Sequence, residues 1–149
     1  MMFSNILVVC VGNICRSPTA EFLLRKKIQE KGSKINIASA GVGALVGKPA
    51  ASKAAEYAAT IGLDLSGHIA RQLTREMARE YDLILVMEEG HIRAVEGIAP
   101  EARGKVHLLG RWHSNIEIPD PYRKGDQAFK HALDLIRVTV EEWVGKLVR

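Results

Sequence analysis

The sequence predicts an α/β fold in which helices cover both faces of a doubly wound, four-stranded parallel sheet. Residues 6–9 (ILVV) and 82–87 (DLILVM) are short apolar runs, which are typical of strands buried on both faces. Helical spacing of apolar residues follows the first run, and a second helical pattern ends the chain. Strands that alternate with helices form parallel βαβ units with right-handed crossovers, so these observations together indicate this architecture.

The first half of the 149-residue chain is expected to form one βαβ unit followed by a loop and a helix. Gly32 and Gly62 are placed to end the two helices, since glycine favours the position just after a helix. The predicted elements are, in order, a strand at 6–9, a loop at 10–18, a helix at 19–31, a strand at 34–40, a glycine-rich loop at 41–49, a helix at 51–61 and an irregular link at 63–73.

The second half is expected to complete the sheet and to end in a long amphipathic helix, with Thr74 as a candidate N-cap of a short helix. The predicted elements are a helix at 74–80, a strand at 82–87, a short helix at 88–97, a strand at 105–109, a polar loop at 110–123 and a helix at 125–149. We expect a single domain over residues 1–149. The expected strand order is 2-1-3-4, which places the first strand centrally and a site at the carboxyl ends of the strands.

Residues 10–18 (CVGNICRSP) are expected to form a tight loop between the first strand and the first helix. Gly12 is expected to let the backbone turn, and Asn13 tolerates a left-handed conformation. Ser17 is a candidate N-cap, and Pro18 suits the first helical position. Unpaired N–H groups and the positive end of a helix dipole meet at such a loop, so it is expected to hold an oxyanion of phosphate size.

Two side chains make this loop a candidate catalyst. A thiol at Cys10 is expected to ionise readily beside a helix N-terminus and Arg16, and so to act as a nucleophile. Arg16 can bind two phosphate oxygens through its planar guanidinium, and the Ser17 hydroxyl can donate to the thiolate. The residues expected to surround the phosphate are Val11, Gly12, Asn13, Ile14, Cys15, Arg16 and Ser17. The Cys-x5-Arg spacing alone is weak, because a cysteine at a strand end is usually a small buried hydrophobic residue, but the surrounding strand, turn and helix favour catalysis.

The segment CVGNICRSPTAE resembles the signature loop of the low-molecular-weight protein tyrosine phosphatases. The resemblance continues in SAG at 39–41, HIARQL at 68–73, YDLILVME at 81–88 and IPDPYR at 118–123. The likeness is closest to bacterial phosphatases that are paired with tyrosine autokinases of exopolysaccharide and capsule synthesis. It implies hydrolysis of phosphotyrosine through a phosphocysteine, without a cofactor or metal. The implied partner is the tyrosine-rich tail of a membrane-bound autokinase.

The segment IPDPYR supplies the expected second half of the site. Asp120 lies after the fourth predicted strand, at the same sheet edge as Cys10, and two flanking prolines stiffen its backbone. An Asp-Pro pair alone is often only a turn. Since the family has its general acid in this motif, the resemblance implies that Asp120 protonates the leaving oxygen. Tyr122 is expected to line the wall that receives the substrate ring.

The resemblance also implies residues around the loop. Leu45 stands where animal members of the family carry a large aromatic residue, so we expect an open, aliphatic wall there. The family positions whose hydrogen bonds hold the loop in shape are matched by Asn13, Ser17, Ser39 and His68.

Composition and charge exclude several classes of function. The net charge of +4 is modest, and no run of Lys and Arg interleaved with aromatic residues indicates nucleic-acid binding. The two cysteines, five residues apart, match neither a secreted disulfide scaffold nor a zinc site. The sequence shows no signal peptide and no run long enough to span a membrane, so we expect a cytoplasmic protein without direct membrane insertion.

Three other functions fit the sequence less well than phosphatase activity. An arsenate reductase can share this fold and loop, but it requires a distant resolving cysteine, and the chain has only Cys10 and Cys15. A non-catalytic phosphate- or phosphoprotein-binding module does not require both a nucleophile and an acid. A thiol redox sensor is expected only as a regulatory layer, in which Cys15 traps oxidised Cys10 as a reversible, protective disulfide.

Overall fold

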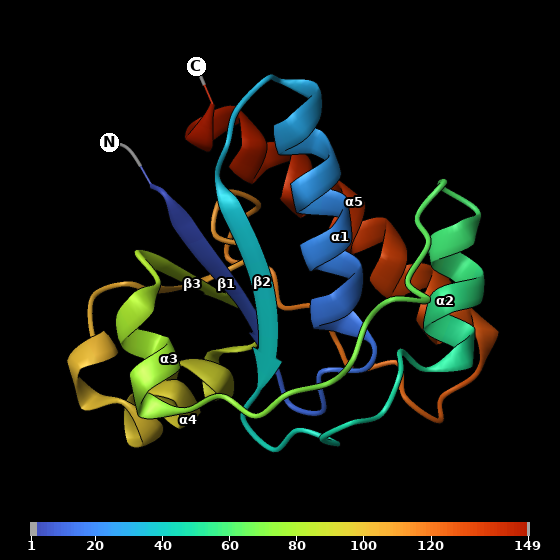
Figure 1. The fold of residues 1–149 in the computed structure, drawn as a ribbon. Helices are drawn as coiled ribbons and strands as arrows, with labels where there is room; N and C mark the ends of the chain where they lie inside the picture. The colour runs from blue at the N-terminus through green and yellow to red at the C-terminus, as the bar shows by residue number, and fades with distance from the viewer. Residues whose placement is uncertain (1–2, 149) are drawn as a thin grey trace.

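The four strands form one parallel sheet in the order β2-β1-β3-β4, as the computed structural model of residues 3–148 shows (Figure 1). The predicted fold class and strand order are therefore confirmed. The strands are β1 (Asn5–Cys10), β2 (Asn36–Gly41), β3 (Leu83–Val86) and β4 (Val106–Leu108). Because β1 pairs with β2 on one side and β3 on the other, the strand that ends at Cys10 lies inside the sheet.

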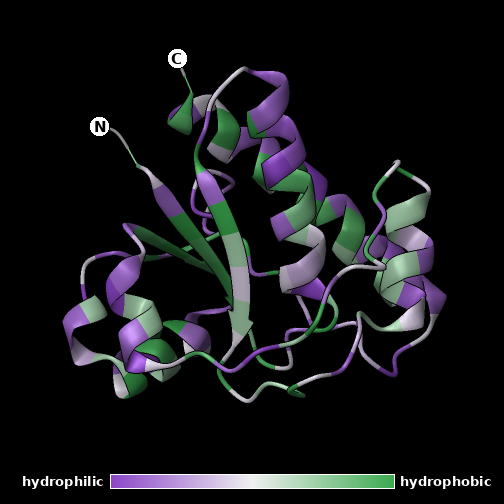
Figure 2. Cartoon of the chain, in the orientation of Figure 1, coloured by the Kyte–Doolittle hydropathy of each residue, from purple (hydrophilic) through white to green (hydrophobic). Residues whose placement is uncertain are grey.

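Helices cover both faces of the sheet. The helices α1, α2 and α5 lie on one side of it, and α3 and α4 lie on the other (Figure 1). The elements are α1 (Arg16–Glu30), α2 (Ser52–Ala59), α3 (Arg75–Glu80), α4 (Glu89–Ile98), the short 3-10 helix η1 (Pro100–Ala102) and α5 (Asp126–Leu147). The strands are apolar along most of their length, whereas each long helix has a polar outer face (Figure 2).

Side chains along β1 point alternately to the two faces of the sheet, and this alternation decides which face Cys10 points to. Every side chain from Ile6 to Val9 is fully buried, as a strand covered on both faces requires. Ile6, Val8 and Cys10 pack in the cluster with α1 and α5, while Leu7 and Val9 pack in the opposite cluster with α4. The period-2 geometry of the strand therefore turns the Cys10 side chain toward α1.

The start of α1 differs from the prediction. The helix begins at Arg16, so Ser17 lies inside its first turn and is not the N-cap, and Pro18 is not the first helical residue. Cys15 takes the N-cap position without a side-chain capping bond. The left-handed residue of the loop is Asn13, with φ 59°, while Gly12 has no positive φ. The Thr74 cap is confirmed, since its hydroxyl accepts the Met77 N–H at 3.1 Å.

Candidate active site

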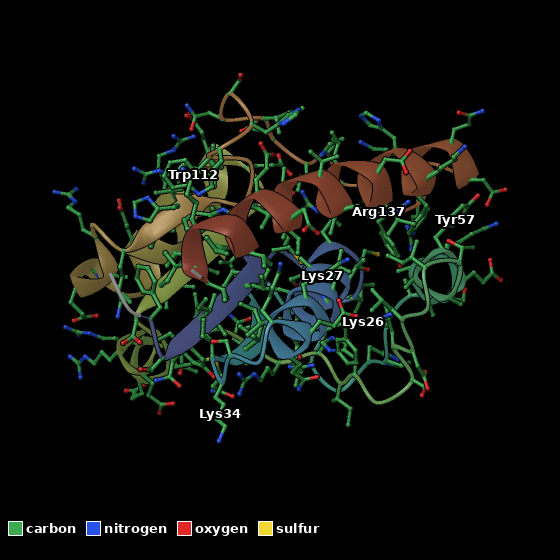
Figure 3. All side chains as sticks on the ribbon, turned by 90° about the horizontal axis from the view of Figure 1, so that it is seen from above. Lys26, Lys27, Lys34, Tyr57, Trp112 and Arg137 are labelled. Atoms are coloured by element: carbon green, nitrogen blue, oxygen red, sulfur yellow. The ribbon has the colours of Figure 1, made fainter. Side chains whose placement is uncertain are left out.

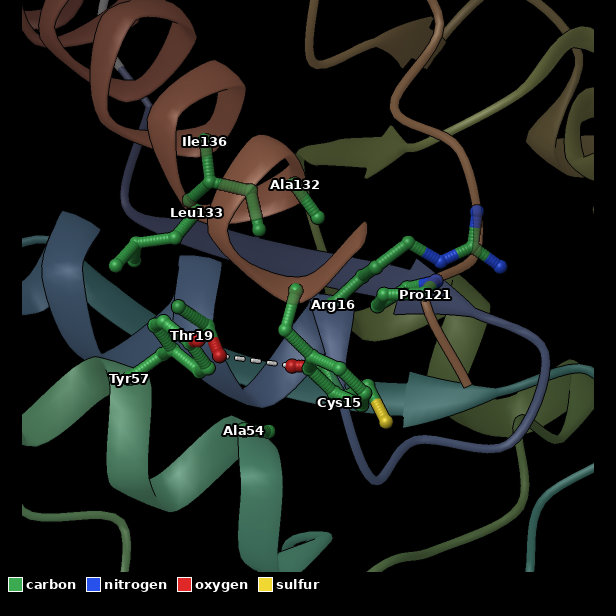
Figure 4. Close-up of a pocket in the computed structure, with 10 residues that line it drawn as sticks. Cys15, Arg16, Thr19, Ala54, Tyr57, Pro121, Ala132, Leu133 and Ile136 are labelled. Atoms are coloured by element: carbon green, nitrogen blue, oxygen red, sulfur yellow. Dashed lines mark hydrogen bonds between the residues drawn. The ribbon is translucent and has the colours of Figure 1, made fainter. Parts of the chain in front are cut away.

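The loop between β1 and α1 is held from outside through its carbonyl groups. The carbonyls of Cys10, Val11 and Gly12 accept hydrogen bonds from the backbone N–H groups of residues 42, 43 and 45, at 3.0, 3.0 and 3.1 Å. The next three carbonyls are bonded by His68 Nε2, the Ala51 N–H and Thr19, whose hydroxyl bond is drawn in Figure 4. All six carbonyls from residue 10 to residue 15 thus have partners outside the loop.

The N–H groups of the same loop are left unpaired. Within residues 3–148, the N–H groups of residues 11–15 donate no hydrogen bond to a protein atom, and Arg16 and Ser17 open a helix whose first N–H groups have no intrahelical acceptor. With its carbonyls bound outward, the loop is arranged to bind an anion through backbone donors.

Gly41 explains why the neighbouring segment approaches so closely. A Cβ atom at this position would lie 2.3 Å from the Val11 carbonyl oxygen, a distance that no real Cβ contact shows. The absence of a side chain therefore lets the end of β2 and the loop after it brace the anion loop.

A buried polar network links the loop to the thiol. Asn13 donates from Nδ2 to the Ser17 and Ser39 hydroxyls, at 2.8 and 2.9 Å. The Ser17 hydroxyl is also hydrogen-bonded to Cys10 Sγ, 2.9 Å away, and it is the donor when Cys10 is a thiolate, which has no proton to give. Ser39 in turn donates to Glu21. The structure thus brings together all the residues that the sequence assigned to this network.

Arg16 is 3% exposed and is held by groups that the sequence analysis missed. Its Nη1 donates to the Ile118 carbonyl at 2.8 Å and forms an ion pair with the Glu88 carboxylate. Within the described residues, Nε and Nη2 form no hydrogen bond, which leaves one edge of the guanidinium for a ligand. In the sequence, Glu88 stands directly after a buried strand and ends the motif YDLILVME, but neither feature indicates a contact with Arg16.

His91 supports the same contact from α4. Its Nδ1 accepts the N–H groups of Met87 and Glu88, at 3.3 and 3.2 Å, and its Nε2 lies 3.7 Å from the Glu88 carboxylate. The pKa of His91 is lowered, first because burial penalises the imidazolium and second because Arg16 repels it, although Glu88, Glu117 and Asp120 act in the opposite direction. A neutral ring is what the two accepted N–H groups require.

A cleft of about 190 Å³ opens over the loop, and the predicted acid and wall residues line it. Asp120 faces this cleft together with Cys10, and its Oδ1 accepts the Tyr122 N–H at 3.0 Å. Leu45 and Tyr122 form the exposed rim, with 45% and 40% of their surface accessible. The Arg123 guanidinium carbon lies 5.3 Å from the centre of the Tyr122 ring, over its face.

Cys15 is buried among apolar residues and lines two cavities, one of which is the active cleft. The other is a small cavity between α2 and α5 that also contacts Tyr57, Phe129 and Ile136 (Figure 4). Burial and the neighbouring Cys10 raise the pKa of the Cys15 thiol to about 12, so this thiol stays protonated at neutral pH. Both cysteines are free thiols, and the protective disulfide stays a prediction.

Residues 5–149 match the sequence profile of the low molecular weight phosphotyrosine protein phosphatases. The chain belongs to this family. It is 51% identical to the low molecular weight protein-tyrosine-phosphatase Etp of Escherichia coli strain K12, over 100% of this chain and 98% of the relative. The solved Vibrio vulnificus Wzb in complex with benzylphosphonate superimposes with a TM-score of 0.93 and 48% identity, covering 97% of this chain and 99% of that one. The enzyme class predicted from the sequence is confirmed.

A more distant structure marks the branch of the family. The arginine phosphatase YwlE, solved with a phosphorylated serine in place of its active-site cysteine, has a TM-score of 0.90 but only 28% identity, covering 95% of this chain and 94% of that one. The higher identity to Etp and Wzb confirms the predicted likeness to their branch of the bacterial phosphatases.

The contact between Glu88 and Arg16 gives a first prediction for this phosphatase. Glu88→Gln is expected to lower kcat/KM for an aryl phosphate about 10- to 100-fold, because a charge-assisted hydrogen bond contributes about 1.5–3 kcal/mol. Steady-state kinetics measure the loss. The matched control is Glu89→Gln, which removes the same charge from an exposed neighbour and should leave the rate unchanged. Equal losses in both variants would contradict a positioning role for Glu88.

The lowered pKa of His91 gives a second prediction, for stability. As the pH falls below about 6.5, the unfolded chain takes up a proton at this histidine that the folded protein resists, so the free energy of unfolding should decrease. His91→Asn keeps an acceptor near the position of Nδ1 and cannot titrate. The free energy of unfolding of this variant should therefore decrease less as the pH falls. Urea unfolding of both proteins at neutral pH and at about pH 5 measures the difference, and parallel declines would refute the argument.

Proposed function

We propose that residues 1–149 act as one phosphatase domain that hydrolyses phosphotyrosine through a phosphocysteine at Cys10. One observation carries this proposal: the Cys10 sulfur is hydrogen-bonded to the Ser17 hydroxyl at a loop with unpaired N–H groups, while Asp120 lines the same cleft. A nucleophile, an anion site and a carboxyl group are therefore arranged around one position for a phosphorus atom.

The reaction proceeds in two displacements. In the first, the Cys10 thiolate attacks phosphorus, the bond from phosphorus to the tyrosyl oxygen breaks, and Asp120 gives its proton to that oxygen. In the second, the Asp120 carboxylate takes a proton from a water molecule that attacks phosphorus. The phosphorus–sulfur bond then breaks, which releases inorganic phosphate and restores the thiolate. In YwlE, the serine that replaces the active-site cysteine carries a phosphoryl group, which supports a covalent step at the corresponding loop position.

Positive charge for both transition states comes from the loop and from Arg16. The N–H groups of residues 11–17 surround the equatorial oxygens, and the unbound edge of the guanidinium binds two of them. Because Nη1 is already fixed by Glu88 and Ile118, the guanidinium is oriented before the substrate arrives. Such preorganisation is what lets fixed dipoles lower a barrier without rearranging.

The depth of the site favours phosphotyrosine over phosphoserine. Cys10 is 3% exposed at the floor of the cleft, whereas Leu45 and Tyr122 stand at its rim. A phosphate on a tyrosine ring reaches the floor while the ring lies between these two walls. Phosphoserine and phosphothreonine are too short for the phosphate to reach the sulfur while the peptide stays outside.

The proposed partner is the tyrosine-rich tail of a membrane-bound autokinase that governs polysaccharide export, met in the cytoplasm. Within residues 3–148, no helix has the length and apolar character needed to cross a bilayer. The rim of the cleft contacts few residues around the phosphotyrosine, so its affinity for any one sequence is low. A tail with clustered phosphotyrosines compensates for this low affinity through high local concentration.

The partner is tested with purified, autophosphorylated kinase. We expect the enzyme to release phosphate from the kinase tail, and to act on matched phosphoserine peptides far more slowly, because only the longer side chain reaches Cys10. Phosphate release is measured under identical conditions for both. Faster release from phosphoserine would overturn the assignment to tyrosine, and no release from the kinase would remove this partner.

The general-acid role of Asp120 is tested with two substrates whose leaving groups differ in their need for a proton. Asp120→Asn should lose roughly 10²–10⁴-fold in kcat on a phosphotyrosine peptide, since general acid catalysis contributes about that much. The loss should be smaller on an aryl phosphate whose leaving group departs without a proton. Asp134→Asn, which removes an exposed carboxylate from α5, serves as the matched control. Equal losses on both substrates would show that Asp120 acts by positioning alone.

A further inference from the structure

One of the cavities away from the active cleft has a volume of about 500 Å³ and contains both tryptophans. It is formed by the beginnings of β3 and β4 and by the last turns of α5, whereas the active cleft lies beyond the carboxyl end of β1. Its volume falls within the range of small-molecule binding sites, about 300–1,000 Å³. Neither the fold nor the proposed reaction requires it.

Two tryptophans form the aromatic part of this cavity. Trp143 is 4% exposed, and its Nε1 donates to the Leu108 carbonyl at 3.3 Å, so its ring is a fixed floor. Trp112 meets it edge-to-face with 5.5 Å between ring centroids, yet 38% of its surface remains accessible. In Figure 3, Trp112 stands beside the far end of α5, on the opposite side of the molecule from Lys34. An exposed aromatic wall on a rigid base is suited to bind another ring.

Two cations lie over the ring of the exposed tryptophan, and a third lines the same cavity. The Arg111 guanidinium carbon and Lys146 Nζ lie 5.0 and 4.6 Å from the centre of the Trp112 ring, and Lys105 lines the cavity beside them. Within residues 3–148, none of the three forms an ion pair with a carboxylate. Each retains unused N–H donors, because Arg111 donates once, to His107, and Lys105 donates once, to the Tyr81 carbonyl.

Among residues 3–148, Asp82 is the one carboxylate that lines the cavity, and it already accepts hydrogen bonds. Asp82 Oδ2 accepts the backbone N–H groups of Ser4 and Asn5 at 2.7 and 3.0 Å, which ties it to the start of β1. The cavity therefore offers an excess of positive charge beside an aromatic wall. This combination complements an anion carried on an aromatic ring.

We propose that this cavity binds a second phosphotyrosine side chain of the same substrate chain while another occupies the active site. Lys105, Arg111 and Lys146 pair with the phosphate, and the tyrosine ring packs against Trp112. The inference rests on the proposed function, since it requires a substrate with clustered phosphotyrosines. It gives the enzyme a second contact with such tails, in addition to the active cleft.

The fold sets the spacing between the two phosphotyrosines. Leu83 of the cavity pairs with Ile6, four residues before Cys10, so the sites are separated by at least about 13 Å along the strand at 3.3 Å per residue. An extended chain covers about 3.5 Å per residue, so a two-residue spacer spans about 10 Å and an eight-residue spacer about 30 Å. The two-residue spacer is therefore shorter than this separation, and the eight-residue spacer exceeds it.

Tryptophan emission reports this cavity selectively. The chain has 2 tryptophans, both line this cavity, and neither lines the active cleft. Titrating Cys10→Ser with a singly phosphorylated tyrosine peptide is expected to change the emission saturably. The change should be lost when Arg111→Glu and Lys146→Glu are added. It should persist with Lys31→Glu and Lys34→Glu together, which make the same change in charge at two exposed positions before the opposite edge strand, β2. An equal response to inorganic phosphate or ATP, or no response to the peptide, would overturn the proposal.

Kinetics separate this inference from the proposed function. On doubly phosphorylated peptides, the enzyme should show a KM about tenfold lower for the eight-residue spacer than for the two-residue spacer, through raised local concentration. The Arg111→Glu/Lys146→Glu variant should lose this difference while hydrolysing p-nitrophenyl phosphate normally. If the difference persists in the variant, the inference is wrong. If the enzyme fails to hydrolyse p-nitrophenyl phosphate at all, the proposed function itself fails.

Discussion

The outward hydrogen bonds of six consecutive carbonyls, from Cys10 to Cys15, are the constraint on which the site depends. A peptide unit directs its carbonyl and its N–H in opposite directions, so fixing one fixes the other. Partners after β2, before α2 and at His68 hold the carbonyls, and the N–H groups of the loop are left for an anion. Because residues 11–16 line one cleft, a single anion can satisfy several of these donors together. Close approach at Gly41 makes the bracing geometrically possible.

The same logic extends to the charged groups. Burying the Arg16 cation carries a desolvation penalty. The Glu88 carboxylate and the Ile118 carbonyl offset this penalty, and they also fix the plane of the guanidinium. These partners come from the ends of the third strand and the polar loop after the fourth. The parallel sheet therefore does more than carry Cys10: it gathers the segments that orient the nucleophile, the cation and the proposed acid at one edge.

Most of the architecture could be predicted because its signals are local. Buried strands, glycine at helix ends and the Thr74 cap each have a short-range cause, and the strand order follows from the connections. The prediction that Ser17 is the N-cap was wrong because tertiary contacts prevailed over capping propensity. The Asn13 amide and the Cys10 sulfur both form hydrogen bonds with the Ser17 hydroxyl inside the first turn. The outward carbonyl bonds and the Glu88 contact could not be predicted, since they join backbone or side-chain groups far apart in sequence and leave no periodic pattern. His91 was passed over for the same reason, because its role depends on two N–H groups that only the folded turn presents.

The central claim is that the braced loop serves covalent catalysis at Cys10. The most direct test is rapid acid quenching of the wild-type enzyme during turnover of an aryl phosphate, followed by mass spectrometry of the peptide that contains residues 10–15. The account predicts a phosphoryl group on Cys10 that forms within the turnover time and disappears when substrate is exhausted. Sustained turnover with no phosphate on this peptide, or with phosphate on another residue, would contradict it.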